Sequence, residues 1–281
     1  MIDLNDYNYK VGFVSNHSIY KNPLETIEDQ KTTDFINYYS QNGEDGVLEK
    51  IFDVLDIKEG TFINGGCDDI YDHSNVRRLV SLFGWRGLFI EPNLKMLEQG
   101  RNYLLNDERI TTSGSEIKYH FHCGLLSQNK ESERIGNIIE KYYADKNLFD
   151  LVTLHIDSYE YWVLEDFLKG HYDAKVILIG YNFSRDDSVT VPKESPPKIG
   201  HQSITDNFYS ASAPALTKLA KEYGFQLVSV CKPNNLIFVH KRFNKNLFKV
   251  CDPLEKKDYF WEGDSYTNKK RKYVTDGWVK V

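Results

Sequence analysis

The sequence lacks the patterns that mark several large classes of protein. Its cysteines, Cys67, Cys123, Cys231 and Cys251, are far apart and form no CxxC pair, so neither a zinc ribbon nor a disulfide framework is predicted and reduced thiols are expected. No uninterrupted apolar run approaches the ~20 residues that a membrane-spanning helix needs. The amino terminus, MIDLNDYNYK, lacks the apolar centre of a secretory signal. We therefore expect a cytoplasmic protein without a membrane span.

An excess of positive charge is also missing. The formal net charge is -6 over 281 residues, which disfavours an extended nucleic-acid-binding surface. The basic run KKRK at 269–272 is interpreted as a solvated segment rather than as a binding site for a polyanion. We expect no nucleic-acid partner, and the oligomeric state is left open.

What the chain does contain is an alternation of strand and helix patterns. Short apolar and β-branched runs predict strands at 61–63, 87–90, 109–113, 119–126, 149–157, 174–181, 225–230 and 236–240. Apolar positions at helical spacing predict helices at 44–55, 74–83, 94–105, 132–144, 159–168 and 214–223. This order predicts an α/β fold, a doubly wound and mainly parallel sheet with a terminal antiparallel hairpin.

The pattern also divides the chain. Residues 1–37 show no sustained periodicity and are expected to form an N-terminal arm, 38–241 the α/β domain, and 242–281 a C-terminal extension. The stretch 183–208 is rich in Ser, Asp and Pro and begins at a strand's carboxyl end. Long loops in compact domains are usually functional or disordered, so we expect a substrate-side lid there.

Two neighbouring strand ends have the pattern of a nucleotide site. Gly65 and Gly66 follow the first strand, and Glu91 with Pro92 follows the second. In a doubly wound sheet a glycine turn lets a nucleotide approach the backbone, and an acid about 20 residues later can accept hydrogen bonds from the ribose hydroxyls. A glycine pair alone is also typical of an ordinary turn. The segment 64–69 lacks G-x-G-x-x-G, which disfavours a nicotinamide-dependent oxidoreductase.

His120 and His122 share one face of a predicted strand. Two imidazoles can bind a metal ion, but no third ligand is evident nearby in the sequence, so packing or surface roles are favoured over ligation.

Six segments in order match motifs of one family. They are YSQNGEDG at 39–46 (SQ-x-GEDG), 62–75 (FVE-x-GA-x-DG, then SN), LFIE at 88–91, DLVTLHIDSYEYW at 150–162 (D-L-x-S-I-D-x-D-G-x-D-Y-W), 176–182 (VVIEYN) and YSAS at 209–212 (YGAS). On these motifs the chain resembles the FkbM-like S-adenosylmethionine-dependent methyltransferases, a family with the class I, Rossmann-like fold.

The resemblance implies S-adenosyl-L-methionine as the cofactor. Glu91 would bind the ribose, and Gly65, Gly66 and Asp69 would surround the methionine half. The full set of cofactor positions that it implies is Gln41, Glu44, Asn64, Gly65, Gly66, Asp69, Ser74, Asn75, Glu91 and Pro92. Tyr159, Tyr181 and Asn182 would line a sugar or other polyhydroxyl acceptor, although the tyrosines also suit core or rim positions.

The chain departs from the family pattern where the chemistry is expected. Asn64 replaces an acid and cannot neutralise a positively charged cofactor group. Ile70 replaces a glycine. His155 replaces an Asp and Gly180 replaces a Glu, so two hard oxygen ligands are lost, which argues against an oxygen-coordinated divalent ion.

These departures leave several functions open. The leading hypothesis is O-methylation of a sugar hydroxyl on a glycan or glycolipid, with His155 or Asp157 as the base. The alternatives for His155 are a buried, satisfied histidine and, with Asp157, a ligand of a softer metal. A second hypothesis is a catalytically degenerate relative that serves as a binding or scaffolding module.

Overall fold

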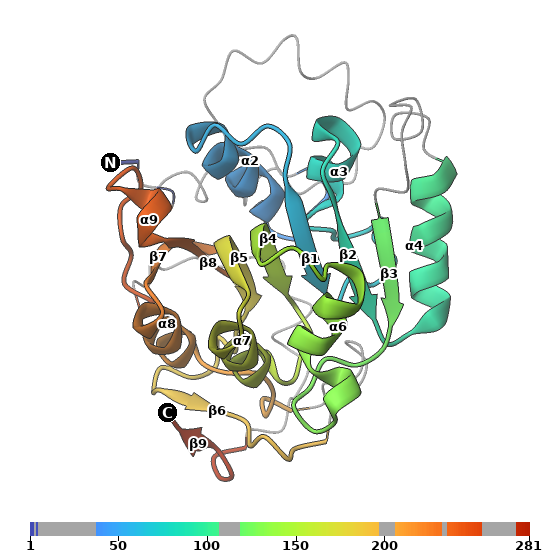
Figure 1. The fold of residues 1–281 in the computed structure, drawn as a ribbon. Helices are drawn as coiled ribbons and strands as arrows, with labels where there is room; N and C mark the ends of the chain where they lie inside the picture. The colour runs from blue at the N-terminus through green and yellow to red at the C-terminus, as the bar shows by residue number, and fades with distance from the viewer. Residues whose placement is uncertain (3, 5–37, 107–118, 197–205, 232–234, 255–273) are drawn as a thin grey trace.

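A seven-stranded sheet forms the centre of the protein (Figure 1). The computed structural model describes residues 1, 2, 4, 38–106, 119–196, 206–231, 235–254 and 274–281. The strands of the sheet are β1 (Thr61–Gly65), β2 (Arg86–Glu91), β3 (Tyr119–Cys123), β4 (Leu148–Leu154), β5 (Asp173–Gly180), β7 (Phe225–Cys231) and β8 (Asn235–His240). Two short strands, β6 (Val189–Thr190) and β9 (Val279–Lys280), pair separately.

The strand order is β3-β2-β1-β4-β5-β8-β7. Strands β1 to β5 are parallel, β8 runs antiparallel beside β5, and β7 closes the edge antiparallel to β8. The order reverses beside β1, with β2 on one side and β4 on the other, which is the topological switch point of a doubly wound sheet. This is the order and polarity of a class I methyltransferase sheet, so the expected fold class is confirmed.

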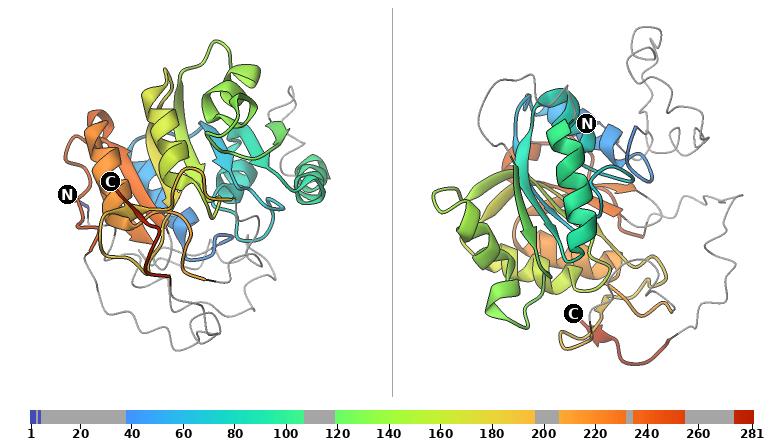
Figure 2. Two further views of the ribbon diagram at one scale, coloured as in Figure 1. Left: turned by 90° about the horizontal axis from the view of Figure 1, so that it is seen from below. Right: turned by 90° about the vertical axis from the view of Figure 1, so that its right-hand side faces the viewer.

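Helices cover both faces of the sheet (Figure 2). On one face α2 (Glu44–Val54), α3 (Arg77–Phe83) and α4 (Leu94–Asn106) pack on side chains such as Phe62 and Phe89. On the other, α6 (Ile135–Tyr142), α7 (Glu160–Lys169) and α8 (Ala213–Glu222) pack on Ile63, Leu88 and Ile90. Successive strand residues thus serve opposite faces, and both faces are buried, as a parallel sheet requires.

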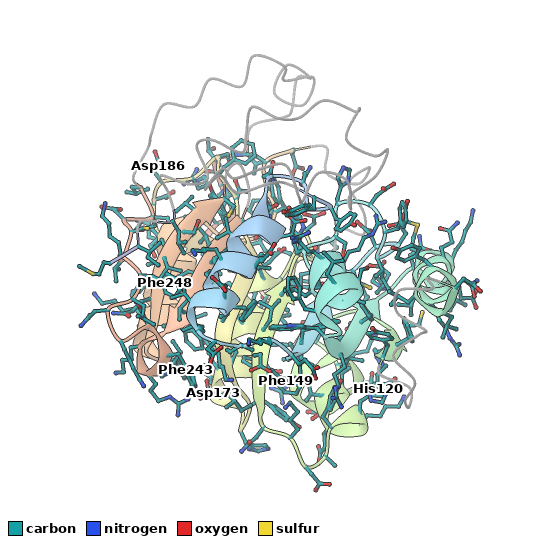
Figure 3. All side chains as sticks on the ribbon, turned by 90° about the horizontal axis from the view of Figure 1, so that it is seen from above. His120, Phe149, Asp173, Asp186, Phe243 and Phe248 are labelled. Atoms are coloured by element: carbon teal, nitrogen blue, oxygen red, sulfur yellow. The ribbon has the colours of Figure 1, made fainter. Side chains whose placement is uncertain are left out.

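The segment after β8 adds to this core. Beyond the short helix α9 (Lys241–Asn244), Phe248 is fully buried together with Leu4. The backbone of Ile2 accepts from Lys249 N and donates to Leu247 O, both at 2.8 Å. Phe248 lies at the β7–β8 end of the molecule, opposite His120 on β3 (Figure 3).

Several expectations about individual elements need correction. Strand β4 ends at Leu154 rather than at Asp157. The expected lid contains β6, whose partner β9 comes from the C-terminal segment. The expected strand at 109–113, most of the arm 1–37, the turn residues 232–234 and the basic run 269–272 lie outside the described residues. No helix in the described ranges is long and apolar enough to cross a bilayer.

Candidate functional site at the switch point

The turn after β1 packs tightly against the loop that follows β4. Gly66 has φ +75°, and a Cβ added to it would lie 2.0 Å from the carbonyl oxygen of His155. The amide of His155 donates to Gly65 O at 2.9 Å, and Gly66 N donates to Ile90 O at 2.9 Å. Gly66 is therefore required by contact within the protein. The turn joins the carboxyl ends of β1, β2 and β4.

The chain after Gly66 continues in left-handed conformations. Asp68, Ile70 and His73 have φ values of +47°, +63° and +55°. A β-branched residue in this region is a backbone outlier, and Ile70 stands where the resembled family has glycine. Ile70 is fully buried, with its side chain against the backbone of Gly100 in α4. Packing therefore holds a conformation that the side chain disfavours.

Glu91 connects the two strand ends that the sequence singled out. Its Oε2 accepts from Asp68 N at 3.2 Å and its Oε1 from Asn93 N at 2.9 Å. The residue is only 5% exposed, and this burial, with a contribution from the Asp68 charge, raises the pKa of its carboxyl. The acid after β2 thus lies directly beside the turn after β1, as expected for a nucleotide site.

Asn64 lies on β1, one residue before the strand ends at Gly65. It is buried, and its Oδ1 accepts from the Thr153 hydroxyl of β4 at 2.6 Å. The amide oxygen therefore stabilises the β1–β4 pair, and a negative charge is missing at this position.

The remaining residues of the loop mainly stabilise its own backbone. Asp69 Oδ1 accepts from Tyr71 N and Asp72 N, each at 3.0 Å. Ser74 Oγ accepts from Arg77 N at 3.2 Å, so it caps α3 in the expected way, although the helix itself begins only at Arg77. Asn75 is buried beside this cap.

The lead-in to α2 contributes a second acid to the same side of the sheet. Glu44 is fully buried and accepts from Asn42 N at 2.7 Å and from Asn235 Nδ2 at 2.8 Å, which ties the start of α2 to β8. Gln41 is exposed on this lead-in, and Pro92 is half-buried directly after Glu91. Glu44 thus has a structural role in addition to its predicted place near the cofactor.

Asp45, next to Glu44, organises the lead-in backbone. Its carboxylate accepts from the amides of Tyr38, Tyr39, Ser40 and Gly46 and from the Ser40 hydroxyl. Burial nevertheless raises its pKa to about 6.

His155 and Gly180 occupy one place in the structure. His155 lies half-buried in the loop after β4, and its Cδ2 is 2.7 Å from the position of a Cβ on Gly180, at the end of β5. A side chain at position 180 would collide with this ring. The two departures from the family pattern are therefore spatially coupled, because the imidazole covers the backbone where the family has a glutamate.

Asp157 follows on the same loop. It is half-buried and has φ +57°, so the backbone turns sharply after Ile156. His155 and Asp157 therefore lie on a turn after β4, whereas the sequence predicted that the strand continues to Asp157.

Glu160, the first residue of α7, was not predicted as a site residue. Its side chain is buried, and its Oε1 accepts from Ile156 N at 3.1 Å. Burial, followed by the nearby charge of Asp157, raises its pKa to about 7. The sequence signal for Glu160 was the last acid of the motif matched at 150–162.

The three predicted acceptor residues have strong structural contacts. Tyr159 is buried and its hydroxyl donates to the carbonyl of Ser195 in the 183–196 loop. Tyr181 is buried, which raises the pKa of its hydroxyl. These contacts suit the alternative of core aromatics.

Asn182 is fully buried and uses its whole amide within the protein. Both Nδ2 hydrogens are donated, to Asn207 O and Tyr209 O, and Oδ1 accepts from the amide and hydroxyl of Ser184. An acceptor sugar would therefore have to displace existing bonds to reach this amide, and the acceptor role of Asn182 stays a prediction.

His120 and His122 pack against aromatic rings on α6 and its end. The His120 ring lies 5.2 Å from the Tyr142 and Tyr143 rings, and His122 Nδ1 is 3.3 Å from the Tyr142 hydroxyl. Burial, and secondarily Lys141, lowers the pKa of His122. Within the described part of the chain, no three His, Cys, Asp or Glu side chains are placed to hold a metal ion.

Comparisons with known proteins find similarity at the level of structure. No family model matches the chain, and no curated protein matches it. Among solved structures, the N-terminal domain of EvdMO1, in the presence of SAH and D-fucose, is 10% identical, with a TM-score of 0.43 over 75% of this chain and 88% of that one. A S-adenosylmethionine-dependent methyltransferase from Clostridium acetobutylicum ATCC 824 is 12% identical, with a TM-score of 0.39 over 70% and 90%. Magnesium protoporphyrin IX methyltransferase (ChlM) from Synechocystis PCC 6803, with bound SAM, is 10% identical, with a TM-score of 0.37 over 73% and 86%.

Proposed function

We propose that the protein is an S-adenosylmethionine-dependent O-methyltransferase that acts on a sugar hydroxyl of a glycan or glycolipid. The observation that carries the proposal is the hydrogen bond between Glu91 at the end of β2 and Asp68 in the turn after β1. It lies at the switch point of the sheet, where doubly wound folds bind nucleotides. The ordered motifs between 39 and 212 support the same assignment.

The residues at the switch point fit an adenosyl group. Each Glu91 oxygen accepts one backbone N–H and retains a lone pair, so a ribose diol can donate to it. The turn from Gly65 to Asp69 would hold the methionine half. Because Asn64 is neutral, it would bind the cofactor's amino group by hydrogen bonding alone.

The reaction follows from the position of His155 and Asp157. The bound cofactor would supply an electrophilic methyl group on a sulfonium. His155 or Asp157 would accept the proton of the acceptor hydroxyl, so that the acceptor oxygen could form the C–O bond as the C–S bond breaks and its electron pair stays on sulfur.

The acceptor class and the location belong to the same proposal. Half-buried Tyr161 and Trp162 pack edge to face at 5.0 Å at the start of α7, close in sequence to both candidate bases. We propose that these two rings contact the acceptor sugar. The proposed site of action is the cytoplasm.

Calorimetric titration with S-adenosylhomocysteine tests the cofactor assignment. We expect saturable binding that weakens at least ~10-fold in Glu91→Ala, because the variant loses charge-assisted hydrogen bonds worth ~1.5–3 kcal/mol. Glu98→Ala, at an exposed position of α4, is the matched control. Absence of binding by the wild type at ~1 mM ligand, a concentration at which even a ~1 mM Kd would be detected, would remove the assignment.

One observation favours the alternative, a non-catalytic binding or scaffolding module. The acid expected at position 155 is replaced by His155, and the acid expected at position 180 is replaced by Gly180. The His155 ring covers the Gly180 backbone. Incubation with methyl-labelled cofactor and a panel of sugars and glycolipids separates the two functions. Product that is lost in the double variant His155→Ala/Asp157→Asn supports the enzyme, whereas cofactor binding without product from any acceptor supports the module.

A further inference from the structure

Glu160 is a buried acid that the proposed reaction does not use. Its residue is 1% exposed, and Oε2 lacks a well-aligned hydrogen bond among the described residues. An unsatisfied, buried carboxyl oxygen is costly, so its retention calls for an explanation.

The surroundings of Glu160 join three segments of the site. Its Oε1 accepts from Ile156 N at 3.1 Å, and Ile156 lies between the two candidate bases. The same oxygen is 3.6 Å from the position of a Cβ on Gly180, on the side of the backbone that the His155 ring covers. Ser210, before α8, donates to Gly180 O at 3.5 Å.

We propose that Glu160 is a positioning residue that holds the turn carrying His155 and Asp157 in the orientation needed for proton removal from the acceptor. This inference rests on the proposed methyltransferase function. The Ile156 amide is its point of action, because a bond at the middle of the turn fixes the residues on both sides. The left-handed Asp157 makes the turn strained, so it needs such a tether.

The titration of Glu160 provides a measurable signal for this role. Two titratable groups border Glu160, namely Asp157 and His155 on the turn. Its other neighbours are the Gly180 backbone at the end of β5 and the Ser210 hydroxyl before α8. Burial, followed by the Asp157 charge, raises the pKa of Glu160, and the Ser210 hydroxyl opposes the rise. Loss of the Glu160 proton near pH 7 therefore changes the acceptor of the Ile156 amide from a neutral to a charged group.

Nuclear magnetic resonance of isoleucine-¹⁵N protein without ligand tests the inference. We expect the Ile156 amide signal to shift with a midpoint near pH 7 in the wild type. In Glu160→Gln the shift disappears, and in Asp157→Asn the midpoint moves to lower pH, because the opposing charge is gone. An unchanged midpoint in Asp157→Asn would show that Glu160 does not sense the charge on the turn, and would overturn the inference.

Two further variants complete the design. Glu160→Ala should speed hydrogen exchange at Ile156 at least ~10-fold, equivalent to ~1.4 kcal/mol, while Glu165→Gln, on the same helix and paired with Lys169, should behave as the wild type. A pH midpoint that persists in Glu160→Gln, or unchanged exchange in Glu160→Ala, would overturn the inference. S-adenosylhomocysteine binding tests the proposed function separately. If the protein binds this ligand but the Ile156 amide signal does not follow the titration of Glu160, only this inference fails.

Discussion

The close approach of His155 to Gly180 explains two departures from the family pattern as one event. The imidazole fills the space above the end of β5, and the backbone there tolerates no side chain. A histidine and a glycine far apart in the sequence thus form a single packing unit. The two positions are expected to be energetically coupled, because any side chain at 180 would clash with the His155 ring.

Substitution of this pair tests the coupling. Gly180→Ala should destabilise the wild type by about 1–3 kcal/mol, because the new Cβ overlaps the His155 ring. In a His155→Ala background the same change should cost at least ~0.5 kcal/mol less. Urea unfolding of the four proteins measures the coupling, and strictly additive effects would contradict the packing unit.

Ser210 gives a second prediction at the residue scale. It occupies a glycine position of the YGAS motif and has φ +56°. Ser210→Gly should raise the free energy of unfolding by about 1 kcal/mol, since glycine adopts this conformation without strain. Ser210→Ala is the control, because it removes the hydroxyl but keeps the strain, and thermal unfolding should show no stabilisation.

At the scale of elements, the sequence predicted those strands and helices that local apolar patterns determine. The apolar runs of β1 and β2, and the stripe of α2, are local signals and appear where expected. The early end of β4 was missed because it depends on the Ile156–Glu160 hydrogen bond and on the left-handed Asp157. Strand β6 was missed because its partner β9 comes about ninety residues later, and such pairing leaves no local period.

The pairing of β6 with β9 should stabilise the loop that follows β5. Trp278 packs edge to face on Phe208 at 4.9 Å, and Ser188 Oγ donates to Val281 O at 2.7 Å. Trp278→Ala should therefore speed hydrogen exchange of the Val191 amide, which is bonded to Ser210 O, while shifting the melting temperature of the whole protein by less than ~3 °C. Equal exchange rates in both proteins would show that the β6–β9 pair does not support the loop.

At the scale of the whole molecule, two buried acids make stability depend on pH. Asp45 and Glu160 have pKa values raised to about 6 and about 7. Because their folded pKa lies above the unfolded value, their protons stabilise the folded state at low pH, and this stability is lost as the pH rises through the folded pKa. For Glu160 the window runs from 4.5 to about 7 and corresponds to ~3 kcal/mol.

Glu160→Gln isolates this contribution. The free energy of unfolding of the variant relative to the wild type should rise by ~3 kcal/mol between pH 4 and pH 8, since glutamine cannot ionise. Urea unfolding at both pH values measures the change, with Glu165→Gln, a partly exposed salt-bridge position, expected to vary by less than ~1 kcal/mol. A pH-independent difference would show that folding does not shift the pKa of Glu160.

The insertion of β8 between β5 and β7 affects how the chain is made on the ribosome. Because β7 is synthesised first yet pairs only with β8, the edge of β5 stays bare until residues up to His240 have left the exit tunnel. A bare edge of apolar β-branched residues invites pairing with other nascent chains. Ribosome stalling while β8 is still inside the exit tunnel should therefore yield species that need chaperones, whereas stalling once residues up to Phe248 have left the tunnel should allow the sheet to close.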